Sequence, residues 1–129
     1  MFTIQSASSS SLVRFRDLEG DNFTVEVETY PVTARARVSA FAVGDGLARW
    51  FGELGVSQLP WKGSREWASM ERDFIISATC ASNGRIAFTI DLSGLPGSYE
   101  EWHVSVGLSS ELGLLPSIGE TARHFFAGA

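Results

Sequence analysis

Asp91 and His103 are the residues of this chain whose types and positions could do acid–base chemistry. They lie in two consecutive runs of alternating apolar and polar residues, a pattern that indicates β-strands. We expect the runs to pair as antiparallel strands, with Ile90 opposite Val104. That register places Asp91 beside His103 on the outward face, one rung from Ser105. Serine, histidine and aspartate within reach of one another are the groups of a hydrolytic triad.

A hydrolase is nevertheless the less favoured interpretation. The chain contains no G-x-S-x-G nucleophile elbow, in which a strained turn exposes the serine. It shows no evident loop of donors for an oxyanion, and an outward polar row is ordinary on a half-exposed sheet. Glu71 and Asp73 flank a strand start, where we expect them to stay solvated rather than to converge as a glycosidase pair. The sequence therefore predicts no catalytic residue. An enzyme that uses Asp91 and His103 is the least favoured of three hypotheses, and the other two are binding functions.

Metal and cofactor sites are not predicted either. His124 is expected near the end of a helix without a second ligand nearby, and Cys80 is the only cysteine, so neither a cysteine cluster nor an intramolecular disulfide can form. Gly44 and Gly46 match neither a phosphate-binding loop nor a dinucleotide fingerprint. We therefore expect no cofactor and no bound metal.

Trp61 and Trp67 lie in a segment, residues 55–72, that contains Pro60 and Gly63 and is predicted to be a loop. Two tryptophans in a loop can form a platform on which a sugar stacks. They can equally cover the edge of the core, with their indole N–H groups bonded to backbone carbonyls. A cover is the favoured interpretation, and a small-molecule or carbohydrate site at Trp61 and Trp67 is the alternative.

Charged residues alternate with apolar ones along three further predicted strands. One antiparallel register pairs Glu28 with Arg35 and Glu26 with Arg37, and extending it places Arg14 beside Glu26. Each such pair is worth about 0.2–1 kcal/mol. Exposed ion pairs most often mark a solvated face whose register they help to set. The alternative is a partner-binding surface, for which these five residues and His103 are the candidates.

The central hairpin is the firmest local prediction. Residues 74–80 and 86–92 both alternate with a period of two. A three-residue loop at 82–84 places Ala78 opposite Phe88 and makes every facing pair apolar, whereas a two-residue Asn-Gly turn would put polar groups on the apolar face. We therefore expect the three-residue loop, with its glycine in the left-handed region.

Two helices are expected in the chain. Asp45 is a plausible N-cap for the first helix, and Gly55 is a plausible stop. Pro116 suits the first turn of the second helix. The apolar stripes of the two helices are Leu47, Trp50, Phe51 and Leu54, and Ile118, Ala122 and Phe125.

These elements predict an α+β fold, with a mostly antiparallel twisted sheet of about six strands and two helices packed on one face. At 129 residues, with 44% hydrophobic and 12% aromatic residues, the chain is expected to form a single domain at 1–129. Within it, residues 1–11 form a flexible or edge segment: a short strand at 2–4 followed by a serine-rich connector.

The composition also restricts the partners. The formal charge is −5 and the isoelectric point is near 4.9, which disfavours nucleic acids and membrane surfaces, since both are anionic. An acidic chain permits a basic protein partner. The N-terminus lacks the pattern of a signal peptide, and no apolar run reaches the roughly 20 residues of a membrane span. We therefore expect a cytoplasmic protein, of an oligomeric state that the sequence leaves open.

The stretch from Trp61 to Glu71 reads W-x-G-x-x-x-W-x-S-x-E, and it is followed by the Asn-Gly turn, a W-H-V strand and paired phenylalanines in the last helix. This order resembles a group of small bacterial proteins, mainly actinobacterial, known only as a domain of unknown function. The resemblance covers residues 40–127, and the segment 113–119 departs from it. It implies no activity, so it supplies no catalytic residue. The size and layout are similar to those of immunity proteins that neutralise bacterial toxins.

The leading hypothesis is therefore a non-enzymatic binding protein, most concretely an immunity-like inhibitor of a bacterial toxin. It depends on the small size, the acidic charge and the exposed charged sheet face. The alternative, from another class, is the small-molecule or carbohydrate module at the tryptophan loop.

Overall fold

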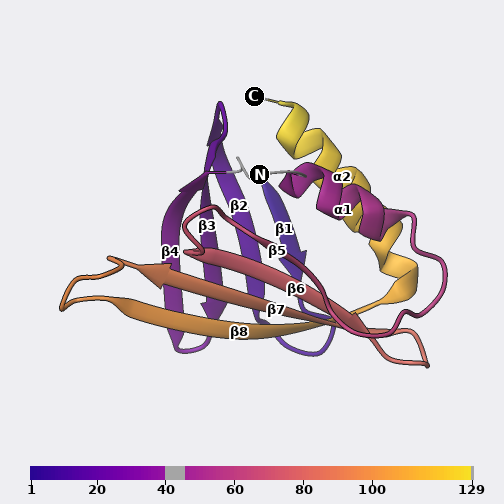
Figure 1. Cartoon of the computed structure of the whole chain (residues 1–129). Helices are drawn as coiled ribbons and strands as arrows, with labels where there is room; N and C mark the ends of the chain where they lie inside the picture. Colours follow the sequence, from indigo (N-terminus) through magenta and orange to yellow (C-terminus); the bar gives the residue numbers. More distant parts are fainter. Residues whose placement is uncertain (40–45, 129) are drawn as a thin grey trace.

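The computed structural model describes residues 1–39 and 46–128, and this part of the chain is α+β, as predicted (Figure 1). The strands are β1 (Phe2–Gln5), β2 (Leu12–Glu19), β3 (Asn22–Thr29), β4 (Val32–Ser39), β5 (Arg65–Ala68), β6 (Phe74–Cys80), β7 (Arg85–Gly94) and β8 (Trp102–Glu111). The helices are α1 (Leu47–Gly55) and α2 (Leu115–Ala127), and a short 3-10 turn (Leu112–Leu114) leads into α2.

The strands form two sheets rather than the one sheet of about six strands that the sequence predicted. Sheet A has the order β1-β2-β3-β4 and sheet B the order β5-β6-β7-β8, and each is an antiparallel meander. Figure 1 shows the strands of sheet B crossing those of sheet A. The prediction failed because alternation only requires each strand to bury one face, and a second sheet facing the first satisfies this as well as an added strand does.

The core lies between the two inner faces and is rich in phenylalanine. Phe15 of β2 packs against Phe2 with ring centroids 5.0 Å apart, and against Phe74 of β6 at 5.9 Å. Phe23 of β3 also contacts Phe74, at 6.3 Å. All four side chains are at most 1% exposed. Aromatic edge-to-face contacts therefore join the two sheets.

The helices close one side of this core. The predicted stripe of α1 is buried, and its Phe51 ring lies 5.1 Å from Phe2 of β1. The helices cross closely at Gly55 and Gly119, because a Cβ on Gly119 would lie 3.0 Å from the Cα of Gly55 and from the carbonyl oxygen of Phe51. Figure 1 shows α1 and α2 side by side next to β1. The predicted cap Asp45 lies outside the described residues.

The central hairpin has the register that the sequence predicted. Ala78 faces Phe88, and the amide of Ala81 donates to the carbonyl of Arg85 at 2.9 Å, which leaves residues 82–84 as the loop. Gly84 has a φ of +86°, a conformation that a glycine adopts without steric cost.

The register between β3 and β4 differs from the prediction by two residues. Glu26 faces Arg35, and Arg37 faces Thr24 rather than Glu26. The cause is the position of the turn, which lies at Tyr30 and Pro31, between the paired Thr29 and Val32. The predicted register would have centred the turn on Pro31 and Val32. A shift of two positions keeps every side chain on its predicted face, so the charged residues still point outward.

The register between β7 and β8 also differs by two residues. Ile90 faces Val106, and Asp91 faces Ser105 rather than lying beside His103. The strands instead begin to pair where Gly94 faces Trp102, and the indole occupies the space beside the glycine, since a Cβ there would lie 2.2 Å from the ring. The predicted Asp91–His103 pair is therefore wrong.

The segment 55–72, predicted to be a loop, contains strand β5. Trp67 on this strand faces Ile76 of β6 and is 6% exposed. Part of the predicted loop is therefore a strand that adds Trp67 to the core.

The serine-rich segment between β1 and β2 contacts sheet B. The amide of Ala7 donates to the carbonyl of Ser109 at 2.8 Å, and the amide of Ser109 donates to the Ser6 hydroxyl at 3.1 Å. Ser6 is only 7% exposed. These bonds hold the first hairpin of sheet A against strand β8.

Candidate functional site

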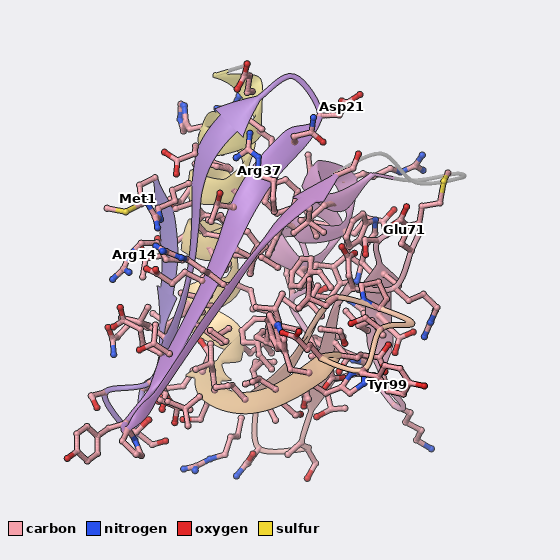
Figure 2. The ribbon with its side chains drawn as sticks, turned by 90° about the vertical axis from the view of Figure 1, so that its left-hand side faces the viewer. Met1, Arg14, Asp21, Arg37, Glu71 and Tyr99 are labelled. Carbon is pink, nitrogen blue, oxygen red and sulfur yellow. The ribbon has the colours of Figure 1, made fainter. Side chains whose placement is uncertain are left out.

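The outer face of sheet A carries a row of charged side chains on β2, β3 and β4. Their neighbours along the strands, such as Phe15 and Val25, are fully buried, so alternation points the charged residues outward. We call this surface the arginine–glutamate face, and its members are Arg14, Arg16, Glu26, Glu28, Arg35 and Arg37. Figure 2 shows Arg14 and Arg37 on this sheet.

Glu26 is the centre of the network on this face. Its carboxylate accepts hydrogen bonds from Arg14 and, at 3.4 Å, from Arg16. Arg14 also donates to Glu28 at 3.2 Å. These bonds, first with Glu28 and then with Glu26, raise the pKa of the Arg14 guanidinium above its ordinary value. The Glu26 side chain is only 12% exposed, so this part of the face is ordered and internally neutralised.

The β4 side of the face is less neutralised. Arg37 donates to the backbone carbonyl of Asp17 at 2.5 Å and to the Thr24 hydroxyl at 3.2 Å, which are uncharged acceptors. Its nearest carboxylate oxygen in the described chain belongs to Glu19, at 3.9 Å. Among residues 1–39 and 46–128, Arg35 makes no side-chain hydrogen bond or ion pair. Two guanidinium groups are therefore available to a partner.

A shallow hollow of about 370 Å³ lies at this end of the face. It is lined by Arg16, Asp17, Thr24, Arg35, Ala36 and Arg37. Arg16 donates to the Asp17 carboxylate at 3.3 Å, while its buried Nε has no hydrogen-bond partner in the described part of the chain. The lining thus carries three guanidinium groups and one carboxylate, and it favours an anion.

The sequence did not single out Arg16 as a candidate. The signal was nevertheless present, because Arg16 follows Arg14 two positions later on the same predicted strand. What could not be read from the sequence is that β4 brings Arg35 to the same hollow, since this follows from the register that the two-residue turn imposes.

His103, the sixth predicted partner-binding residue, is on the outer face of sheet B and not on the arginine–glutamate face. Its Nδ1 lies 2.8 Å from the Ser93 hydroxyl and its Nε2 lies 3.2 Å from the Glu101 carboxylate. The amide of Gly97 and then His103 lower the pKa of Glu101. This serine–histidine–glutamate chain is a poor setting for base catalysis, because the imidazole side chain is 68% exposed and water competes for its bonds.

The two tryptophans do not form a joint platform. Trp67 packs against Phe74 with ring centroids 6.0 Å apart and has almost no exposed surface. Trp61 is half-buried, and the guanidinium of Arg65 lies 4.0 Å above its ring. The predicted bond from its indole N–H to a carbonyl is not formed within the described residues. A hollow of about 570 Å³ beside Trp61 is one location for the ligand-binding alternative, and a second hollow of about 380 Å³ borders Trp61 and Arg65.

Ser69 and Glu71, the end of the tryptophan motif, have different surroundings. The Ser69 hydroxyl accepts from the amide of Phe74 at 3.1 Å and donates to the Asp73 carboxylate at 2.5 Å, so it closes the turn between β5 and β6. Glu71 is exposed and lines, with Arg37, an opening of about 280 Å³ between the sheets. Figure 2 shows the side chains of Arg37 and Glu71 on separate parts of the ribbon.

Within 1–39 and 46–128, no three histidine, cysteine or carboxylate side chains are grouped so that they could hold a metal ion. In the same part of the chain, no helix has the length and apolarity that crossing a membrane requires.

Comparison with known proteins finds one family. A family model described as a family of unknown function, DUF6228, matches residues 4–129, which confirms the resemblance to a domain of unknown function and extends it beyond residues 40–127. No curated protein matches the chain. No solved structure matches it either.

Proposed function

Because the chain belongs to DUF6228, a family of unknown function, we propose a function from its own geometry: a non-enzymatic domain that binds a protein partner through the arginine–glutamate face. The observation that carries the proposal is that Arg35 and Arg37 are outward and lack a close carboxylate partner among the described residues. Arginine is enriched at protein interfaces, where its planar guanidinium makes several directed hydrogen bonds.

The network around Glu26 supports this proposal by ordering the surface in advance. Arg14 and Arg16 are held by carboxylates and are 23% and 32% exposed. Side chains that are already fixed lose less conformational entropy when a partner binds. The β2–β3 part of this face is therefore ordered before a partner binds, and it supports the neighbouring arginines of β4.

The finer proposal is an immunity-like inhibitor of a bacterial toxin. It is supported by the length of 129 residues, the charge of −5 and the α+β layout, and it remains an analogy of size and shape. The net charge would steer the protein toward a basic partner. Arg35, and the donors of Arg37 that its bonds to Asp17 and Thr24 leave over, would then contact an acidic patch on that partner.

The test uses the protein encoded beside this gene as the partner. Wild type, Arg35→Gln/Arg37→Gln and the matched control Arg85→Gln/Arg123→Gln are compared by calorimetry. Both double variants lower the net charge equally, but Arg85 and Arg123 lie on β7 and α2. We expect the Kd to rise about tenfold for the first variant and less than about twofold for the control. Equal effects in both variants would contradict the proposal, as would a wild type that does not bind.

The second candidate function is a ligand site in the hollow beside Trp61. One observation favours it: the half-buried indole, with Arg65 stacked on it, borders a hollow that also includes Pro60 and Cys80. We expect a saccharide or small aromatic ligand to change the tryptophan fluorescence of the wild type and not that of Trp61→Phe. If no compound in a ligand panel changes the fluorescence of the wild type, the result would count against this site.

A further inference from the structure

We propose that the hollow lined by Arg16, Arg35 and Arg37 receives carboxylate side chains from an acidic segment of a protein partner. This inference rests on the proposed function of the arginine–glutamate face and names the chemistry of its partner. It depends on the placement of three guanidinium groups, which come from two strands of sheet A that are not neighbours in the sheet order.

The first argument is the local charge. The lining includes three arginines and the single carboxylate of Asp17, although the chain as a whole has a charge of −5. A positive site on an acidic protein is not explained by a general need for solubility. It attracts a negative group locally.

The second argument is the unused hydrogen-bonding capacity. Each guanidinium has five N–H donors. Arg35 uses none of its side-chain donors in the described structure, and Arg37 uses one nitrogen, which is shared between the Asp17 carbonyl and the Thr24 hydroxyl. Two arginines with free donors on one side of a hollow can hold one carboxylate in a bidentate arrangement.

The third argument favours a carboxylate over a phosphate. Asp17 lines the hollow, and Glu26 lies beside it, where it accepts from Arg16 at 3.4 Å. Three guanidinium groups against these two carboxylates leave a net charge of about +1, which a carboxylate of single charge neutralises and a phosphate dianion exceeds. Glu19 shows that a carboxylate can approach, since it lies 3.9 Å from Arg37 on a side chain that is 92% exposed.

The test uses a capped peptide of six glutamates, with a peptide of six glutamines and inorganic phosphate as the other probes. Binding to the intact protein is followed through the side-chain Nε–Hε signals of the arginines in ¹⁵N spectra. We expect the glutamate peptide to shift the Arg35 signal, with little or no shift from the glutamine peptide. Because the contact is ionic, we expect its affinity to fall as salt is added.

Three variants sharpen the result. Arg35→Gln/Arg37→Gln should raise the Kd for the glutamate peptide about tenfold, and Arg85→Gln/Arg123→Gln should change it less than about twofold. Arg35→Lys keeps the charge but loses the planar fork, so it should lose several-fold in affinity if the contact is bidentate. Arg35 is exposed, and an unchanged amide fingerprint shows that each variant is folded.

Each outcome decides the inference. It is overturned if the Arg35 signal does not move, if both double variants weaken binding equally, or if phosphate binds more tightly than the glutamate peptide. Peptide binding at Arg35 without binding of the neighbour-encoded protein keeps the acidic-segment site and rejects the proposed partner. A neighbour-encoded protein that binds through β4, with no response to the peptide, keeps the proposed function and rejects this inference.

Discussion

The outer faces of the two sheets are built by the same backbone alternation, yet they present different surfaces. The face of sheet A carries arginines and glutamates that bond between β2 and β3, and Arg37 of β4 bonds to Thr24 of β3. The face of sheet B carries mostly small polar or apolar side chains, which are Ser77, Thr79, Ala87, Thr89, Asp91, Ser93, Ser105 and Gly107. On the charged face, ion pairs between β2 and β3 restrain the side chains, whereas on the face of sheet B the bonds of His103 to Ser93 and Glu101 lie where β7 ends and β8 begins.

This difference shows that residues predicted to share one binding surface can lie on different sheets. His103 and Arg35 were predicted to belong to one outer face, and the structure places them on different sheets. The register is also determined differently in the two sheets. On β7 and β8 it follows the inner apolar pairs and the contact of Gly94 with Trp102, and on β3 and β4 it follows a two-residue turn.

The strongest test of the comparison asks whether the two faces cover one cooperative core. Phe15 is fully buried, and its ring lies 5.9 Å from Phe74 of the other sheet. We expect Phe15→Ala to lower the free energy of unfolding by about 3–5 kcal/mol. Hydrogen exchange should then report lost protection in β6 and β7 as well as in β2. Protection lost in sheet A alone would show two separate units.

Gly94→Ala tests the contact that begins the pairing of β7 with β8. The added methyl group would overlap the Trp102 ring, so we expect a loss of about 1–3 kcal/mol in urea unfolding and a changed tryptophan emission. Gly107→Ala is the matched control on the outward side of β8, where an added Cβ has only an ordinary contact at 3.9 Å. Equal losses in both variants would reject the proposed basis of this register.

Glu26→Gln tests whether the network of sheet A is stabilising. The half-buried carboxylate is shared by Arg14 and Arg16, so its loss leaves both guanidinium groups less well paired. We expect about 1–2 kcal/mol of destabilisation, between the values for exposed and buried ion pairs, and less of it in high salt. Asp91→Asn, also half-buried on the outer face of a central strand, should change stability by less than about 0.5 kcal/mol.

Glu101→Gln should have the smallest effect on stability, and that effect should appear only in the response to acidic pH. The amide of Gly97 and His103 lower the pKa of Glu101 in the folded protein. Its contribution to stability is therefore present above the ordinary value of 4.5 and is lost as the pH falls through the lower folded pKa. Lowering the pH below 4.5 should reduce the Tm of the wild type more than it reduces the Tm of Glu101→Gln. The same loss in both proteins would contradict this, and Glu100→Gln is the neighbouring control.

The sequence predicted the candidate site in part. Arg14 was correctly placed beside Glu26, since β2 and β3 pair as expected. Arg35 and Arg37 were correctly assigned to the outer face but to the wrong partners. The hollow itself was not predicted, because its shape depends on which residues of β2 and β4 approach the same point of the face.

What the sequence by itself determined is which way each side chain points. Period-two alternation and the apolar stripe of α1 correctly identified buried residues such as Phe88 and Phe51, and the apolar pairs with Gly84 specified the β6–β7 hairpin. These features are local, and a slip of one residue would expose a whole apolar set to water.

Tertiary structure alone decided how far each strand slides and how the sheets meet. A slide of two residues leaves every side chain on its own face, so the alternation of β3, β4, β7 and β8 cannot detect it. Whether two meanders join at their edges or stack face to face is decided by the phenylalanines of both, since Phe15 and Phe23 bury their rings against Phe74 only when the sheets face each other.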